Sequence, residues 1–169
     1  LFARMLSSSV VVAVITQSEK NRKVLVGAGV PERKIMRVPV GLDPDERRHV
    51  SKQQLDEARV ILGFPDDAKV FLYLGAVRRI RGTYALFDAF AIAAQRQRNI
   101  YLGVLARGAD HNLLVEVHAY CHRLGIGDRV KVVGGWLDRE QVWACIEACD
   151  VVTLPFVVVP SDVPLAILE

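Results

Sequence analysis

Three arginines lie close together in residues 74–82, Leu-Gly-Ala-Val-Arg-Arg-Ile-Arg-Gly. The segment follows a short apolar run typical of a strand, so Arg78, Arg79 and Arg81 stand between Gly75 at a strand end and Gly82 at a helix start. Guanidinium groups and the free amides of a helix N-terminus both bind phosphate oxygens. The spacing matches neither the dinucleotide nor the P-loop fingerprint, so a solvated basic loop stays open as the alternative.

Two further turns follow apolar runs and contain glycine. Gly108 comes three residues after the end of the run 100–105, in the turn Ala-Arg-Gly, where a glycine lets backbone approach a ligand closely. Gly135 precedes Trp136, whose ring is suited to contact with a flat nucleobase. Ordinary turns have the same composition, with Trp136 anchoring the core, so spacing alone does not separate the two interpretations.

The last apolar run leads into a segment with three prolines that ends at Glu169. The final residues, Leu-Ala-Ile-Leu-Glu, are typical of the start of a helix. A carboxylate in that position can accept hydrogen bonds from a pair of sugar hydroxyls. By composition alone, Glu169 is a solvated polar residue.

Histidines and cysteines offer a competing chemistry. His111, His118 and His122 share one helical stripe, but no cysteine or carboxylate completes a tetrahedral set, so we predict no metal site. Cys145 and Cys149 have helical spacing and are expected to pack as small apolar residues. No nucleophile, base and orienting group can be named together, which leaves a hydrolase triad unsupported.

Six short apolar runs, rich in β-branched residues, alternate with longer segments of helical period. This alternation predicts an α/β, Rossmann-like fold with a parallel sheet and helices on both faces. Nearly every position of most runs is apolar, as in strands that are covered on both sides. The predicted strands are Val10–Thr16, Ile35–Val38, Val70–Leu74, Ile100–Leu105, Val130–Val133 and Val151–Leu154.

The helices between these strands are predicted from their caps and apolar stripes. Ser18 begins one that Gly27 or Gly29 ends, Ser51 begins one that Gly63 ends, and Thr83 begins a third. Asp138 and Gln141 have the spacing of a capping box, for a helix that ends near Cys149. Two amphipathic stripes are expected to pack on the sheet, Leu86, Phe87, Phe90, Ala91 and Ala94 in one helix and Leu113, Leu114, Val117, Cys121 and Leu124 in the next.

Composition narrows the class of protein. With 169 residues, 51% of them hydrophobic and 24% charged, the chain is long and apolar enough for one globular domain, which we expect to cover residues 1–169. The net charge of +3 is small and dispersed, which argues against a nucleic-acid partner. The run Val10–Ile15 is too short to span a membrane. An odd number of cysteines favours a reducing cytoplasm, and residues 1–9 are interpreted as a cut end because they lack the features of a secretory signal.

Taken in order, these segments resemble the C-terminal, donor-binding domain of retaining glycosyltransferases with the GT-B fold. That family includes sucrose synthase and bacterial mannosyltransferases. The resemblance covers nearly the whole chain, and its landmarks are residues 14–18 (Val-Ile-Thr-Gln-Ser), 29–35 (Gly-Val-Pro-Glu-Arg-Lys-Ile), 39–43 (Pro-Val-Gly-Leu-Asp), 74–82, 128–135 and 149–155.

The resemblance assigns roles to individual residues. Segment 74–82 is similar to the family's Gly-Arg-Leu-x-x-x-Lys-Gly, with Ala76 in the place of the arginine and Arg81 in the place of the lysine that holds the donor diphosphate. Glu169 matches the second of two family glutamates, which contacts the donor ribose, while Ser161 falls at the first and Asp162 stands beside it. Catalytic roles are thus expected for Arg81, Glu169 and Asp162. Donor binding is expected from Gly75, Arg78, Arg79, Arg81, Gly82, Gly108, Gly135, Trp136 and Glu169.

The resemblance also implies a substrate and partners. The donor is a UDP- or GDP-sugar, the anomeric configuration is retained, and no metal or other cofactor is required in this domain. The acceptor, a glycan or a lipid, is bound by an N-terminal domain outside these residues, and the parent protein is cytoplasmic or peripheral at a membrane. This fragment alone is expected to bind without turnover. A GT-B sugar-nucleotide epimerase, a non-catalytic subunit and a nucleotide-binding regulatory module remain alternatives, and Ala76 and Ser161 fit the subunit.

Overall fold

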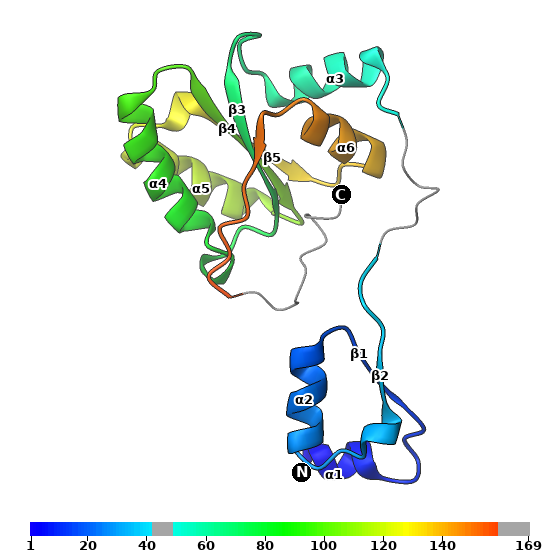
Figure 1. Cartoon of the computed structure of the whole chain (residues 1–169). Coiled ribbons are helices and arrows are strands. Elements are labelled where there is room, and N and C mark those ends of the chain that lie inside the picture. The colour runs from blue at the N-terminus through cyan, green and yellow to red at the C-terminus, as the bar shows by residue number, and fades with distance from the viewer. Residues whose placement is uncertain (42–48, 159–169) are drawn as a thin grey trace. The chain divides into compact units, whose positions relative to one another are not determined.

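The computed structural model describes residues 1–41 and 49–158, which fall into two compact units. The first unit contains residues 1–41 and the second contains residues 49–158 (Figure 1). All six predicted strands are present and all pair in parallel, but they form two separate sheets. The expectation of one domain over residues 1–169 stays a prediction. Within the described residues, no helix combines the length and the apolar character needed to cross a bilayer.

The first unit contains one strand-helix-strand crossover. Its elements are α1 (Phe2–Ser7), β1 (Val14–Thr16), α2 (Glu19–Gly27), the 3-10 helix η1 (Glu32–Lys34) and β2 (Ile35–Arg37). Val14 pairs with Ile35 and Thr16 with Arg37. The predicted strand start at Val10 is wrong, because β2 offers only three residues for pairing and the chain before Val14 has no neighbour in the ladder. Val10 and Val12 are accordingly 86% and 87% exposed.

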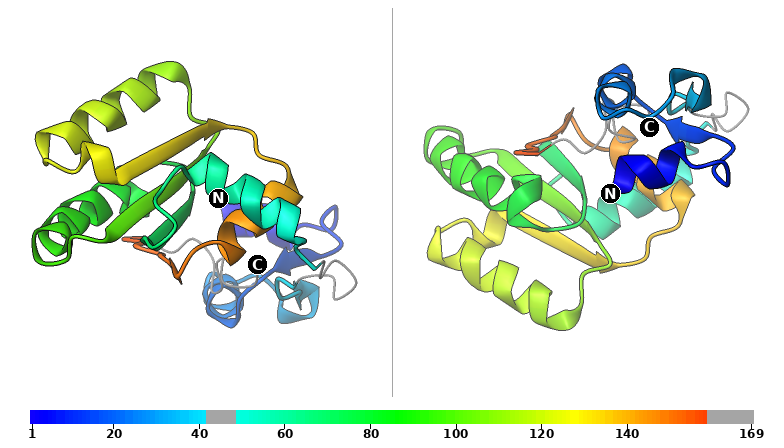
Figure 2. Two further views of the ribbon diagram at one scale, coloured as in Figure 1. Left: turned by 90° about the horizontal axis from the view of Figure 1, so that it is seen from above. Right: turned by 90° about the horizontal axis from the view of Figure 1, so that it is seen from below.

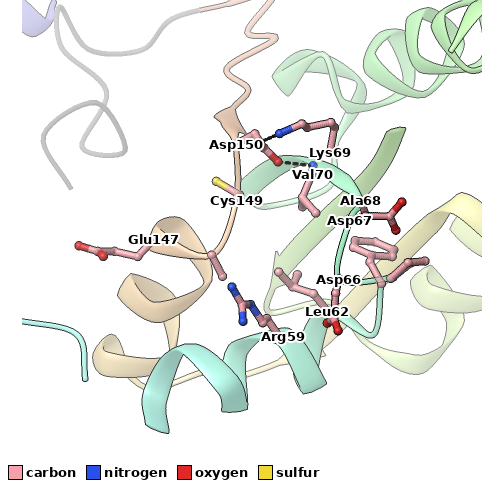
Figure 3. Close-up of a pocket in the computed structure, with 13 residues that line it drawn as sticks. Arg59, Leu62, Asp66, Asp67, Ala68, Lys69, Val70, Glu147, Cys149 and Asp150 are labelled. Carbon is pink, nitrogen blue, oxygen red and sulfur yellow. Dashed lines mark hydrogen bonds and ion pairs between the residues drawn. The ribbon is translucent and has the colours of Figure 1, made fainter. Parts of the chain in front are cut away.

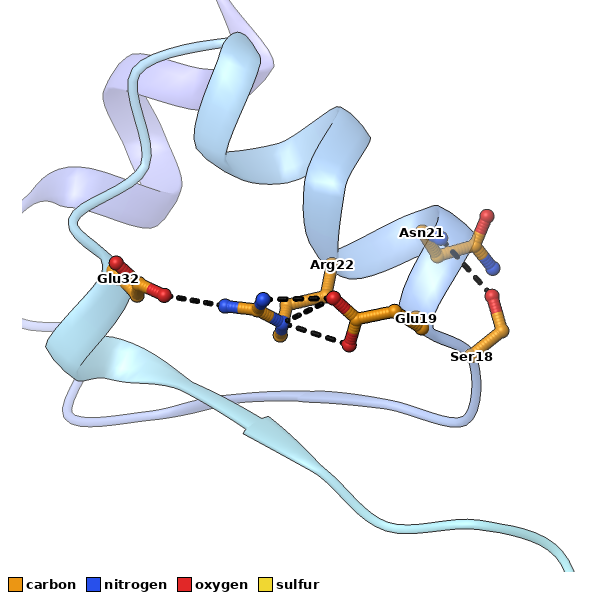
Figure 4. A network of polar contacts seen from close by, with 5 residues as sticks. All are labelled: Ser18, Glu19, Asn21, Arg22 and Glu32. Carbon is orange, nitrogen blue, oxygen red and sulfur yellow. Dashed lines mark hydrogen bonds and ion pairs between the residues drawn. The ribbon is translucent and has the colours of Figure 1, made fainter.

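Polar contacts fix the start of α2. The predicted cap is confirmed, since the Ser18 hydroxyl accepts a hydrogen bond from the Asn21 amide at 3.0 Å. Arg22 binds Glu19 at 2.7 Å, one turn earlier, and also bridges to Glu32 in η1 (Figure 4). These contacts connect α2 to η1, the segment that leads into β2.

The second unit has a four-stranded parallel sheet in the order β5-β4-β3-β6. Its strands are β3 (Lys69–Gly75), β4 (Ile100–Arg107), β5 (Val130–Gly135) and β6 (Val151–Val152). The helices are α3 (Lys52–Leu62), α4 (Thr83–Arg96), α5 (His111–Arg123) and α6 (Arg139–Glu147), with short 3-10 turns η3 (Arg79–Arg81) and η4 (Gly127–Arg129). Figures 1 and 2 show these helices in two layers around the sheet.

Alternate residues of the strands enter two cores, so the prediction of helices on both faces is confirmed for this sheet. Phe71 and Tyr73 of β3 face α4 and α5, where they pack with Phe87 and Val117. Their neighbours in β3 face α3 and α6, and Leu72 packs there with a second set of apolar side chains, Ala58, Leu62, Ala144 and Cys145. Both predicted amphipathic stripes lie in the first core.

The predicted caps of the second unit are also confirmed. Ser51 and Gln54 form a capping box at the start of α3, which ends at Gly63 in the left-handed conformation with φ 64°. Asp138 and Gln141 form another at the start of α6. Local sequence therefore sets where these helices begin. Tertiary pairing extends β3, β4 and β5 beyond the predicted bounds and shortens β6 by two residues.

Candidate functional site

The turns singled out from the sequence lie at one edge of the sheet in the second unit. The strands are parallel, so the ends of β3, β4 and β5 are adjacent, with Gly75 opposite Ala106 and Arg107 opposite Gly135. Ligands of open parallel sheets bind beyond this carboxyl edge. A ligand site is therefore expected at this carboxyl edge.

The turn after β3 is held by hydrogen bonds at both ends. Gly75 has φ 137°, a value that side chains rarely adopt. The buried Tyr73 hydroxyl donates to the Ala76 carbonyl at 2.9 Å, and burial raises the pKa of this phenol. At the other end, the Thr83 hydroxyl lies 3.4 Å from both the amide and the carbonyl oxygen of Arg78. These bonds fix the backbone that carries the three arginines.

The three arginines of this turn have different surroundings. Arg78 and Arg79 are exposed, and the Arg79 guanidinium lies over the Tyr84 ring at 4.7 Å from its centroid. Arg81 is half-buried and lies 5.3 Å from the centroid of Phe156. The Arg81 amide donates to the Arg78 carbonyl at 3.0 Å, but among the described residues its guanidinium has no hydrogen-bond or ion-pair partner. Its donors are thus available to an external anion.

Helix α4 begins directly beside Arg81. Its N-cap is Gly82, which has φ 76° and supplies no side-chain cap, and its first turn contains no acidic residue. The first N–H groups of a helix have no carbonyl partner within that helix and carry its positive dipole end. Arg81, whose guanidinium has no partner among the described residues, thus stands beside the start of α4, where Gly82, Thr83 and Tyr84 are buried.

Gly82 also makes a close backbone contact with the loop that follows β6. A Cβ built on Gly82 would lie 1.7 Å from the Pro155 carbonyl oxygen. The Val158 amide donates to the Ile80 carbonyl at 3.3 Å. The loop 153–158 therefore lies against the turn 78–82, and only glycine fits at position 82.

The turns after β4 and β5 meet through a cation and an aromatic ring. Arg107 lies over Trp136, with its guanidinium carbon 4.7 Å from the ring centroid. Trp136 is 75% exposed, so the interpretation of this residue as a core anchor is wrong. Arg107 was absent from the residues expected at the site, although it directly precedes Gly108 at the end of β4.

Asp162 and Glu169 lie outside the described residues, as does Ser161. His111 is the first residue of α5, which follows the turn after β4, and His118 and His122 lie further along this helix. Cys121 and Cys145 are buried in the two cores with free thiols, and burial raises the pKa of each to about 11. The ring of His122 packs against Gly127. These residues thus make packing contacts.

A surface pocket of about 340 Å³ opens at the other edge of the sheet (Figure 3). Its lining includes Arg59 of α3, Lys69 at the start of β3, Glu147 at the end of α6 and Asp150 just before β6. Since these residues mark the amino ends of the strands, the pocket is remote from the carboxyl edge. We do not assign it to the site.

Asp150 joins β6 to the sheet at this pocket. Its carboxylate accepts the Val70 amide at 2.8 Å and the Lys69 ammonium at 2.9 Å. The bond from the Val70 amide, followed by the Lys69 contact, lowers the pKa of Asp150. The negative charge therefore helps to hold the edge strand in place.

Asp150→Asn is expected to lower the stability of the second unit at pH 7, and this loss should shrink as the pH falls. A lowered folded-state pKa gives stability that is complete above the unfolded value, about 3.9, and that is lost as the pH falls through the folded value. Urea unfolding at pH 7, 5 and 3.5 tests this, with Asp56→Asn on α3 as the control, because its ion pair is long and exposed. A difference between Asp150→Asn and wild type that does not change with pH would contradict the role of the charge.

No protein-family model matches the chain, and no curated protein sequence matches it. Solved structures do. A glycosyltransferase from Rickettsia africae matches with a TM-score of 0.72 and 16% identity, covering 89% of this chain and 40% of its own. Sucrose-phosphate synthase from Thermosynechococcus elongatus gives 0.71 and 21%, with coverages of 98% and 39%.

A third match is Anabaena Alr3699/HepE, solved in complex with UDP-glucose, with a TM-score of 0.67 and 21% identity. It covers 89% of this chain and 39% of its own. The chain thus spans about two fifths of the length of these structures. At these identities the likeness concerns the fold, and the fold of this chain is that of one Rossmann-like half of a GT-B glycosyltransferase.

Proposed function

We propose that this chain is the donor-binding part of a glycosyltransferase that takes a sugar from a UDP- or GDP-sugar with retention of configuration. The observation that supports it most is the unpaired, half-buried Arg81 beside the start of α4, at the carboxyl edge of the sheet. The fold shared with glycosyltransferases, one of which was solved with UDP-glucose, supports the same assignment.

In this proposal, the protein stabilises the departing diphosphate. Negative charge grows on its oxygens as the glycosidic bond breaks, and Arg81 and the first amides of α4 offset that charge without a metal. Trp136 and Arg107 flank the base, Glu169 orients the ribose, and Asp162 lies near the transferred sugar. The acceptor glycan or lipid binds to a domain outside these residues. We propose a cytoplasmic setting, in keeping with the odd number of cysteines, and a peripheral membrane location for a lipid acceptor.

Arg81→Ala is expected to weaken diphosphate binding about tenfold to a hundredfold, because a charge-assisted hydrogen bond contributes roughly 1.5–3 kcal/mol. Arg81→Lys should lose less, since the positive charge remains. Calorimetric titration of the chain with UDP and with GDP measures both variants and shows which base is preferred.

The matched control is Arg59→Ala, which removes the same charge at the opposite edge of the sheet. It should leave the affinity unchanged. Wild-type affinity in Arg81→Ala, or no binding of either nucleotide to the wild-type chain, would overturn the proposed function.

A further inference from the structure

Phe156 lies between the core of the second unit and Arg81. Its side chain is partly buried and packs against the core formed with α4 and α5. The Arg81 guanidinium carbon lies 5.3 Å from the ring centroid. Because a core-packed aromatic ring has little freedom to move, it offers the cation a fixed surface.

The loop that carries Phe156 is itself fixed to the turn that carries Arg81. Gly82 approaches the Pro155 carbonyl so closely that a Cβ has no room, and Val158 bonds to Ile80 at 3.3 Å. The two segments therefore touch on either side of the pair formed by Arg81 and Phe156. Their separation is set by backbone contacts and does not depend on the ring.

A ring contact restrains a guanidinium without using its N–H groups. The attraction is between the positive charge and the face of the ring, so the planar set of donors stays available for phosphate oxygens. A carboxylate in the same place would restrain the arginine but would also neutralise it. Arg81 is less exposed than its neighbours Arg78 and Arg79, as expected for a side chain that is held.

We propose that Phe156 is the positioning residue of the diphosphate site and that it holds the Arg81 guanidinium ready before the donor arrives. This inference rests on the proposed function, because it gives Arg81 the role of phosphate ligand. The side chain of Arg81 then loses less conformational freedom on binding, and ordering one long side chain accounts for about a twofold to tenfold difference in affinity.

Phe156→Leu and Phe156→Tyr separate positioning from packing. Leucine keeps an apolar side chain against the core but removes the ring face, so UDP should bind about twofold to tenfold more weakly. Tyrosine keeps the ring and should restore wild-type affinity. Phe64→Leu is the matched control, because the Phe64 ring contacts the Tyr101 ring, with centroids 5.0 Å apart, and lines the pocket at the opposite edge. It should not change UDP affinity.

The decisive measurement is Phe156→Leu in the Arg81→Ala background. If the ring acts through Arg81, the second substitution should weaken UDP binding no further. Equal losses in both backgrounds, wild-type affinity in Phe156→Leu, or the same loss in Phe156→Tyr would each overturn the positioning role. Wild-type affinity in Arg81→Ala alone would instead overturn the proposed function, so the two failures are distinguishable.

Discussion

Gly82→Ala is expected to destabilise the second unit by about 2–5 kcal/mol. Part of this comes from placing a side chain at φ 76°, which costs about 1–2 kcal/mol. The rest comes from the new Cβ, 1.7 Å from the Pro155 carbonyl oxygen, because overpacking against backbone costs about 1–3 kcal/mol. The chain has two tryptophans, and both are in the second unit, so urea unfolding followed by fluorescence measures this loss.

Gly108→Ala is the matched control for Gly82→Ala. Gly108 has a similar φ of 70°, but nothing lies within 4 Å of its built Cβ. It should lose only the 1–2 kcal/mol of backbone strain. Equal losses of unfolding free energy in Gly82→Ala and Gly108→Ala would show that the close contact with Pro155 does not contribute to the destabilisation.

Phe87→Ala is expected to destabilise the second unit by about 3–5 kcal/mol, the range for removing a large buried aromatic side chain. Phe87 is 0% exposed and packs edge-on against Tyr84, with ring centroids 6.0 Å apart. In the proposed function α4 supplies amides to the diphosphate site, so weaker packing of this helix should also reduce UDP affinity.

Ile92→Ala provides the comparison on the same helix. Ile92 is 57% exposed, and substitutions at such surface positions usually change stability by less than about 0.5 kcal/mol. The same urea titration applies. A loss below about 1 kcal/mol for Phe87→Ala would contradict the packing of α4 on the sheet.

Much of the fold could be predicted because its signals are local. Ser51 with Gln54, and Asp138 with Gln141, bind each other within one turn, so four neighbouring residues contain the whole signal. The strand at Val10 was overpredicted, because β-branched residues favour extended backbone whether or not a partner strand is present.

The environment of the candidate site could be predicted only in part. The turn with Arg78, Arg79 and Arg81 is visible as a cluster of cations between a strand and a helix. The surroundings of these arginines differ because of residues distant in the sequence, since Arg81 contacts Phe156 of the loop that follows β6. The only sequence signal of the contact between Gly82 and Pro155 is the glycine itself, and many turns contain a glycine. Roles for Asp162 and Glu169 remain predictions.

The strand order of the second unit also determines which strand pairs form with the smallest loss of chain entropy. Phe71 of β3 pairs with Leu102 of β4, 31 residues later, and with Val151 of β6, 80 residues later. Closing the longer loop costs about 0.8 kcal/mol more in chain entropy, and β6 contributes only two paired residues in return. On entropy alone, β3, α4 and β4 pair first, and the turn that carries Arg81 lies between β3 and α4. Phe156 follows β6, so on this argument its ring reaches Arg81 after the other strands have paired.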